Sequence, residues 1–202
     1  MTPESERWTE LARRLAEYYA DSLNARGVVL GGSVARGHAD RNSDVDFFVF
    51  VQDFPDVGIR ERAVKHIAGE RWRSHDGKRR QGMVRDCFWS GDARVAVELV
   101  LVDAFETVIH QVLDNLDIDR SKQALLGGLL DAFRLHDDGL VAKWQTRISA
   151  YPGPLSRRVV ESHIYMEPLW IPEIYAGCAG ICCTCPRRFA VWPTASSAYF
   201  TV

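Results

Sequence analysis

A glycine turn and two closely spaced aspartates lie between two short apolar runs of this chain. The turn, Gly31-Gly32-Ser33, directly follows the apolar run 28–30. The aspartates are Asp44 and Asp46, and a run rich in Val and Phe continues from there to residue 51. Short apolar runs bounded by turn residues predict buried strands. The sequence therefore predicts a sheet that carries polar groups at the junction of two of its strands.

The glycine turn has the composition of an anion-binding loop. Two glycines in succession let the backbone approach a ligand closely. Ser33 is expected to begin a short helix, whose free N–H groups suit a phosphate. Arg36 follows closely enough to reach that phosphate, although it could equally cap the short helix or pair with Asp40.

The aspartates suggest a metal site. Asp44 and Asp46 are two residues apart at the start of a strand, so both side chains point to one face. Carboxylate oxygens on one face suit Mg²⁺, which typically binds one or two carboxylates together with substrate phosphates. Glu98 interrupts the apolar strand 94–102 and is the best candidate for a third carboxylate, with Asp103 as the fallback. Three carboxylates can hold two metal ions for phosphoryl transfer.

Together these residues resemble a known signature. The pattern G-G-S-x-x-R-G-x-x-x-x-x-S-D-x-D over residues 31–46 resembles that of the polymerase-β-type nucleotidyltransferase superfamily. Within it, the chain is similar to small bacterial aminoglycoside and minimal nucleotidyltransferases. The resemblance covers roughly residues 27–103, weakens through Pro152, and fails beyond residue 166.

The resemblance implies a function and a set of site residues. The chain would transfer a nucleoside monophosphate, AMP from ATP or the equivalent from another nucleoside triphosphate, to a hydroxyl of a small molecule or protein, releasing pyrophosphate. Two Mg²⁺ ions would be held by the catalytic carboxylates Asp44, Asp46 and Glu98. The nucleotide would be bound by Gly32, Ser33, Arg36 and Ser43. The acceptor and the oligomeric state stay open.

The order of the predicted elements indicates a mixed α/β fold. We expect a nucleotidyltransferase sheet domain over 1–103, with a small mixed sheet and flanking helices, then a helical subdomain over 104–166. In the first part, a helix capped by Thr2 is expected to end at Gly27, a helix over 56–69 to bury Ile59, Ala63 and Ile67, and residues 70–89 to form a hairpin. In the second, Asp103 and Glu106 form a predicted capping box, and helices are expected over 120–135, 138–149 and 155–166.

Composition excludes several classes of protein. The chain has 202 residues, 47% hydrophobic and 26% charged, which is typical of a globular protein. Its net charge of -2 disfavours a large nucleic acid as partner. No run approaches the roughly 20 apolar residues of a membrane span, and the polar N-terminus does not resemble a targeting segment. We therefore expect a cytoplasmic protein.

Two features leave alternatives open. A basic cluster on the hairpin is either a solvated surface or a clamp for phosphate or acceptor; it comprises Arg71, Arg73, Lys78, Arg79, Arg80 and Arg85. Residues 167–202 form an atypical tail that holds four of the five cysteines without the spacing of a zinc site, and that could come from an aberrant reading frame. The chain could also be a non-catalytic nucleotide-binding or antitoxin-like partner module.

Overall fold

A computed structural model describes residues 1–163 of this chain. Within that range, Met1–Ser162 form one compact unit. The predicted tail 167–202, with its cysteines, lies outside the described residues. None of the helices in residues 1–163 combines the length and apolar character needed to cross a membrane.

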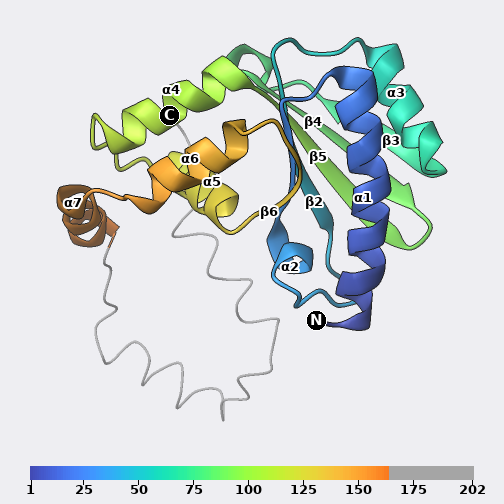
Figure 1. Cartoon of the computed structure of the whole chain (residues 1–202), viewed down its shortest axis with the longest axis horizontal. Coiled ribbons are helices and arrows are strands. Elements are labelled where there is room, and N and C mark those ends of the chain that lie inside the picture. Colours follow the sequence, from blue (N-terminus) through green and yellow to red (C-terminus); the bar gives the residue numbers. More distant parts are fainter. Residues whose placement is uncertain (164–202) are drawn as a thin grey trace, which may run out of the picture. The chain divides into compact units, whose positions relative to one another are not determined.

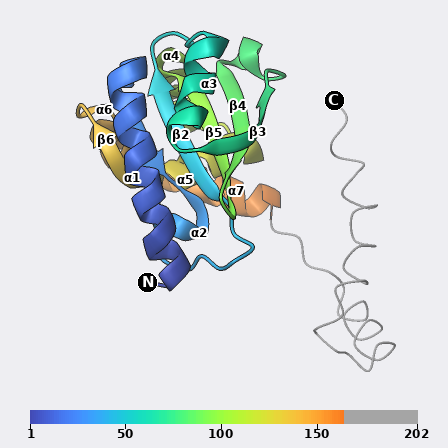
Figure 2. The ribbon, with the colours of Figure 1, turned by 90° about the vertical axis from the view of Figure 1, so that its right-hand side faces the viewer.

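A six-stranded sheet and seven α-helices make up the described unit (Figures 1 and 2). The strands are β1 (Gly27–Leu30), β2 (Val45–Val51), β3 (Gly69–His75), β4 (Met83–Ser90), β5 (Ala93–Leu101) and β6 (Phe133–Asp137). The helices are α1 (Pro3–Leu23), α2 (Gly32–Ala35), α3 (Val57–His66), α4 (Val102–Leu113), α5 (Arg120–Leu130), α6 (Leu140–Ser149) and α7 (Gly153–His163), with a 3-10 turn at Arg79–Gln81.

The sheet is mixed, as the sequence predicts. Its strand order is β3-β4-β5-β2-β1-β6. Strands β2 and β5 pair in parallel, whereas the other neighbours pair antiparallel. Parallel neighbours need a long crossover connection, which here runs through α3 and the β3–β4 hairpin. The predicted α/β architecture, a small mixed sheet with flanking helices, is therefore confirmed.

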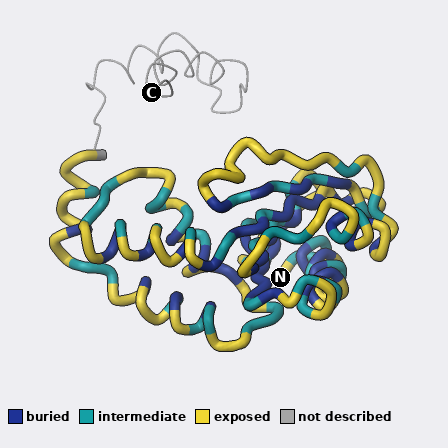
Figure 3. The backbone as a smooth tube through the Cα atoms, turned by 90° about the horizontal axis from the view of Figure 1, so that it is seen from above, coloured by how far each residue is buried: buried dark blue, intermediate teal, exposed yellow. Residues whose placement is uncertain are grey.

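Helices cover the two faces of the sheet unequally. On one face, which we call the α1 face, side chains such as Phe47, Val97 and Leu99 are buried with α1 and α3. On the other, the α4 face, Phe50 and Val100 are buried with α4, α5 and α6. Strands β1, β2 and β5 consist mostly of buried residues. Elsewhere buried and exposed residues alternate along the chain, as the tube in Figure 3 shows. The first residues of β2 on the α4 face remain only partly covered, since Asp44 and Asp46 are half-buried.

Helix α1 anchors the loop that leads to the aspartates. Thr2 caps the helix as predicted, because its hydroxyl oxygen accepts a hydrogen bond from the Ser5 N–H at 3.2 Å. The same hydroxyl donates to the carbonyl of Ala39 at 2.7 Å. The Ser5 hydroxyl accepts from the Ala39 N–H at 2.9 Å. The helix ends at Asn24, in the left-handed conformation, and not at Gly27 as predicted.

Two predictions for the second half of the chain are wrong. The helix expected over 120–135 ends at Leu130, and Phe133–Asp137 form β6, which pairs with β1 at the sheet edge. The expected capping box at Asp103 is absent, because α4 starts at Val102 directly after β5, with Leu101 as its cap. The boundary between a sheet domain and a helical subdomain at residue 104 stays a prediction.

Candidate functional site

The glycine turn and the second aspartate meet at one corner of the sheet. The Gly31 N–H donates to the backbone carbonyl of Asp46 at 2.8 Å, which joins the end of β1 to the start of β2. Gly32 has a φ of +66°, and a Cβ at this position would lie 2.6 Å from Asp46 Oδ2. A side chain at residue 32 would thus collide with the carboxylate and strain the backbone. Glycine is favoured here chiefly by the positive φ, and any Cβ would also displace the Asp46 carboxylate that lies against the turn.

Helix α2 presents unused backbone donors beside that carboxylate. The N–H groups of Gly32 and Ser33 begin α2, and within residues 1–163 they have no backbone acceptor. Arg36, at the other end of α2, is exposed and forms no ion pair with Asp40 or with any other described residue. Ser43 is engaged in its own loop, where its hydroxyl donates to Asp40 Oδ1 at 2.9 Å. Ser43 thus shapes the approach to Asp44.

Glu98 lies on the same face of the sheet as the aspartates. In the parallel pairing of β2 with β5, Asp46 is opposite Ala96 and Phe48 is opposite Glu98. Side chains at alternate positions of a strand share a face. Glu98 therefore lies on the same face as Asp46, two residues further along the common direction of the strands. Asp103 does not take part: it follows β5, whose end lies about 17 Å beyond Ala96 at about 3.3 Å per residue.

Arginines pair with two of the three predicted metal ligands. Arg85 Nη1 lies 3.3 Å from Glu98 Oε1, and Arg94 Nη1 lies 3.5 Å from Asp44 Oδ2. Arg85 belongs to the basic cluster predicted on the hairpin, but the sequence does not predict its pairing with Glu98 and does not single out Arg94. Both ion pairs depend on the register of β4, β5 and β2. Met83, Arg85 and Cys87 are alternate residues of β4 and so share one face of the strand. This alternation is the sequence signal that could have placed Arg85 on the same face as Glu98.

The aspartates of the candidate site fit a metal ion, whereas Glu98 does not lie with them. Carboxylates at Asp44 and Asp46, beside free backbone donors for phosphate, match the chemistry that Mg²⁺ prefers. Within residues 1–163, however, no three His, Cys, Asp or Glu side chains converge closely enough to hold an ion. The aspartate pair is thus assembled, whereas Glu98 is directed to Arg85.

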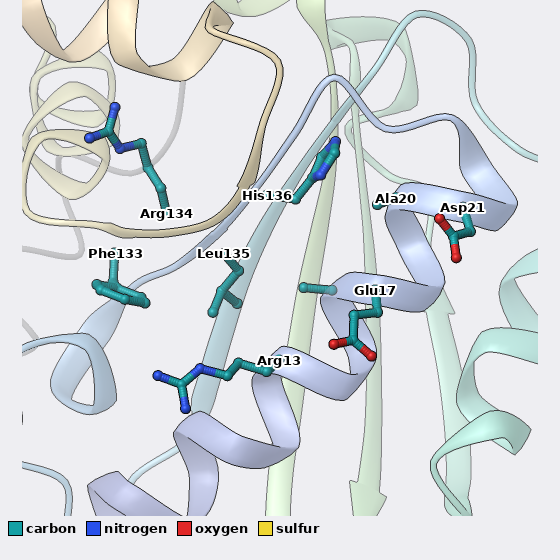
Figure 4. Close-up of a pocket in the computed structure, with 9 residues that line it drawn as sticks. Arg13, Glu17, Ala20, Asp21, Phe133, Arg134, Leu135 and His136 are labelled. Carbon is teal, nitrogen blue, oxygen red and sulfur yellow. The ribbon is translucent and has the colours of Figure 1, made fainter.

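The larger of the two described pockets contains none of the predicted site residues. It measures about 450 Å³ and lies between α1 and β6, where Arg13, Glu17, Phe133 and His136 are among the residues that line it (Figure 4). A smaller pocket of about 180 Å³ is bordered by Glu98 and by the β3–β4 hairpin. Only the second pocket adjoins the candidate site.

Comparison with protein families identifies the region around the glycine turn. Residues 10–79 match the family described as the nucleotidyltransferase domain, a range that includes Gly32, Ser33, Asp44 and Asp46 but ends before Glu98. Over residues 10–79 the chain is therefore similar to the nucleotidyltransferase domain family. This agrees with the resemblance drawn from the residues 31–46. No protein of curated function matches the sequence.

Solved structures similar to this chain are distant and longer. A nucleotidyltransferase-like protein from Exiguobacterium sibiricum is 11% identical, with a TM-score of 0.41, over 76% of this chain and 43% of that chain. A cytoplasmic RNA terminal U-transferase is 16% identical, with a TM-score of 0.39, over 64% and 40%. The Cid1 poly(U) polymerase is 16% identical, with a TM-score of 0.35, over 64% and 41%. This chain thus spans about two fifths of their length.

Two carboxylates of the candidate site have pKa values raised by their surroundings. Burial, and then the neighbouring charge of Asp44, raises the pKa of Asp46, although Arg85 and Arg94 oppose the shift. Burial also raises the pKa of Glu98, against the lowering influence of Arg85 and Lys78. Like charges held together without a cation favour the neutral form. The site therefore favours an added cation.

Removing the Asp46 charge is expected to stabilise the metal-free protein. Because the pKa of Asp46 is raised by folding, its ionisation opposes folding at neutral pH, and this cost disappears below the ordinary Asp pKa of about 4. In a chelator at pH 7, Asp46→Asn should melt above the wild type, and the difference should vanish in acid. Thermal melts from pH 3 to 8 measure this, with exposed Asp53→Asn as the control. A lower melting temperature for Asp46→Asn at pH 7 would contradict the account.

Proposed function

We propose that this chain transfers a nucleoside monophosphate, AMP from ATP, to a hydroxyl of a small molecule or protein and releases pyrophosphate. The observation that supports this most is the corner at which the Asp46 carboxylate lies against Gly32, with Asp44 on the same face. A nucleotidyltransferase domain over residues 10–79 agrees with it. The acceptor and the cytoplasmic location stay predictions.

Each site residue has a proposed role. The N–H groups of Gly32 and Ser33 bind the triphosphate, and exposed Arg36 lies close enough in sequence to contact it. Ser43 positions the loop before Asp44 through its hydrogen bond to Asp40. Asp44, Asp46 and Glu98 would hold Mg²⁺, which when bound neutralises charge on the phosphates and on the attacking oxygen. To bind Mg²⁺, the Glu98 carboxylate would have to break its ion pair with Arg85.

The acceptor oxygen attacks the α-phosphorus while the bond from that phosphorus to the bridging oxygen of pyrophosphate breaks. The hydroxyl proton is released in the same reaction. Catalysis of this kind depends on positioning and on charge stabilisation. Glu98, whose pKa is raised by burial, is the carboxylate on the hairpin side that could accept the proton.

Nucleotide binding is expected to require both a divalent cation and the aspartate pair. Without a cation, Asp44 and Asp46 repel the triphosphate as well as each other. Isothermal titration with a non-hydrolysable ATP analogue should show binding to the wild type only with Mg²⁺, and a loss of about tenfold or more in Asp46→Asn, the scale of a lost charged interaction. Asp53→Asn is the matched control. Equal affinity with and without metal would refute the proposed site.

A second function, a non-catalytic or antitoxin-like partner module, is favoured by one observation. Arg85 and Arg94 hold Glu98 and Asp44 in ion pairs, and the three carboxylates do not converge within residues 1–163. Such a module would bind nucleotide without turnover. Pyrophosphate release from the wild type distinguishes the two functions.

A further inference from the structure

The small pocket beside Glu98 is built mainly from the β3–β4 hairpin. Its volume is about 180 Å³, and it is lined by His75, Gly77, Lys78, Met83, Arg85 and Glu98. Backbone hydrogen bonds order the turn that forms one wall: the Lys78 carbonyl accepts from the N–H groups of Gln81 and Met83 at 2.9 and 3.2 Å. The pocket thus has a defined wall from which Lys78 projects.

Charge in this pocket is dominated by cations. Lys78 and Arg85 face a single carboxylate, Glu98, which Arg85 already neutralises at 3.3 Å. Lys78 itself forms no hydrogen bond or ion pair with the described residues, and neither does the His75 ring. By contrast, neighbouring Arg79 is engaged, with Asp76 at 3.6 Å and the ring of Phe54 at 5.0 Å. Lys78 therefore remains free for an added anion.

The pocket also stands in the right place for an acceptor. Along the sheet, β5 with Glu98 lies between β2, which carries Asp46, and β4, which carries Arg85. The phosphate-binding turn at Gly32 is on the far side of β2. A molecule held by Lys78 and Arg85 would thus approach Glu98 from the side opposite the proposed triphosphate.

We propose that the acceptor is a small anionic hydroxyl compound whose phosphate or carboxylate binds Lys78 and Arg85 in this pocket. The inference rests on the proposed function, because it assigns the second substrate of that reaction. The hydroxyl oxygen of this compound forms the new bond to the α-phosphorus, pyrophosphate departs, and the hydroxyl proton is released. A pocket of this size admits one anionic group, and its cations disfavour polycationic, amino-bearing acceptors.

The first test measures binding without turnover. Inorganic phosphate is titrated into the full chain and followed by NMR at the backbone amides of Gly77 and Lys78, and at those of Gly32 and Ser33. We expect shifts at residues 77–78, with a dissociation constant about tenfold higher or more in Lys78→Gln, as for loss of a charge-assisted hydrogen bond. Arg80→Gln, on the same turn but outside the pocket, should bind like the wild type. Shifts confined to residues 32–33, or equal affinity in Lys78→Gln, would overturn the proposal.

The second test measures acceptor choice by pyrophosphate release from ATP. Matched acceptors are glycerol 3-phosphate and glycerate against glycerol, and glucose 6-phosphate against glucose and glucosamine. Anionic members should have kcat/KM about tenfold higher or more, with the preference lost through KM in Lys78→Gln. A preference for the neutral or amino-bearing acceptors would overturn this proposal alone. Absence of release with every acceptor would overturn the proposed function and this acceptor with it.

Discussion

Replacing Glu98 with Gln is expected to leave nucleotide binding nearly unchanged and to lower kcat by about 100-fold or more, the scale of electrostatic groups at a transition state. Gln keeps the shape of the side chain and removes its charge. The triphosphate would still be held through Gly32, Ser33 and the aspartate pair. The attacking hydroxyl, however, would lose the carboxylate that faces the hairpin pocket.

Glu70→Gln is the matched control for this substitution. Glu70 is exposed on β3, and its side chain forms no hydrogen bond or ion pair with the described residues. Titration with an ATP analogue and pyrophosphate release should be measured on both variants and on the wild type. If Glu98→Gln turns over at the wild-type rate, Glu98 is not a catalytic carboxylate.

The second large effect concerns a buried ion pair that joins α3 to the hairpin. Arg60 Nη1 donates to Asp86 Oδ1 at 2.8 Å and to the Ser74 hydroxyl at 2.9 Å. The side chains of Arg60 and Asp86 are only 2% and 1% exposed, and Asp86 Oδ2 has no partner within the described residues. Burial raises the pKa of Asp86, while Arg60 opposes that shift. Each charge therefore depends on the other.

Breaking this pair should destabilise the protein strongly. Asp86→Ala leaves the buried Arg60 guanidinium with only the half-exposed carboxylate of Asp76, 4.0 Å away, and we expect a loss of about 3–5 kcal/mol in the free energy of unfolding. The double variant Arg60→Met/Asp86→Leu should recover most of it, because it leaves no unpaired charge. Urea unfolding measures both. A loss below about 1 kcal/mol, the scale of exposed ion pairs, would contradict this account of the core.

The part of the site that could be predicted from the sequence is the part formed by residues close together in the chain. Strand β2 (Val45–Val51) ends at residue 51 as predicted, because its apolar run and the aspartates at its start are both local signals. The same holds for the glycine turn and α2. The ion-pair partners of the carboxylates depend on the register of strands far apart in sequence, so the pairs Arg85–Glu98 and Arg94–Asp44 could not be inferred.

The errors in the fold have similar physical causes. Strand β6 reads Phe133-Arg-Leu-His-Asp137 and lies at the sheet edge, where one apolar alternation is too short to distinguish strand from helix. In α3, hydrophobic periodicity predicts Ile59 as buried, whereas the neighbouring Arg60 is the buried side chain, because Asp86 on β4 pairs with it at 2.8 Å. The burial of a charged side chain can be predicted from the sequence only when its oppositely charged partner is known.

The most direct measurement of the proposed activity uses ATP labelled at the α-phosphate. Full-length protein is incubated with labelled ATP, Mg²⁺ and the matched acceptors, and the products are separated and identified by mass. The proposed function predicts label on an acceptor with equimolar pyrophosphate, with both lost in Asp46→Asn and in a chelator. Nucleotide that binds to the wild type but remains unreacted with every acceptor would contradict it and favour the non-catalytic module.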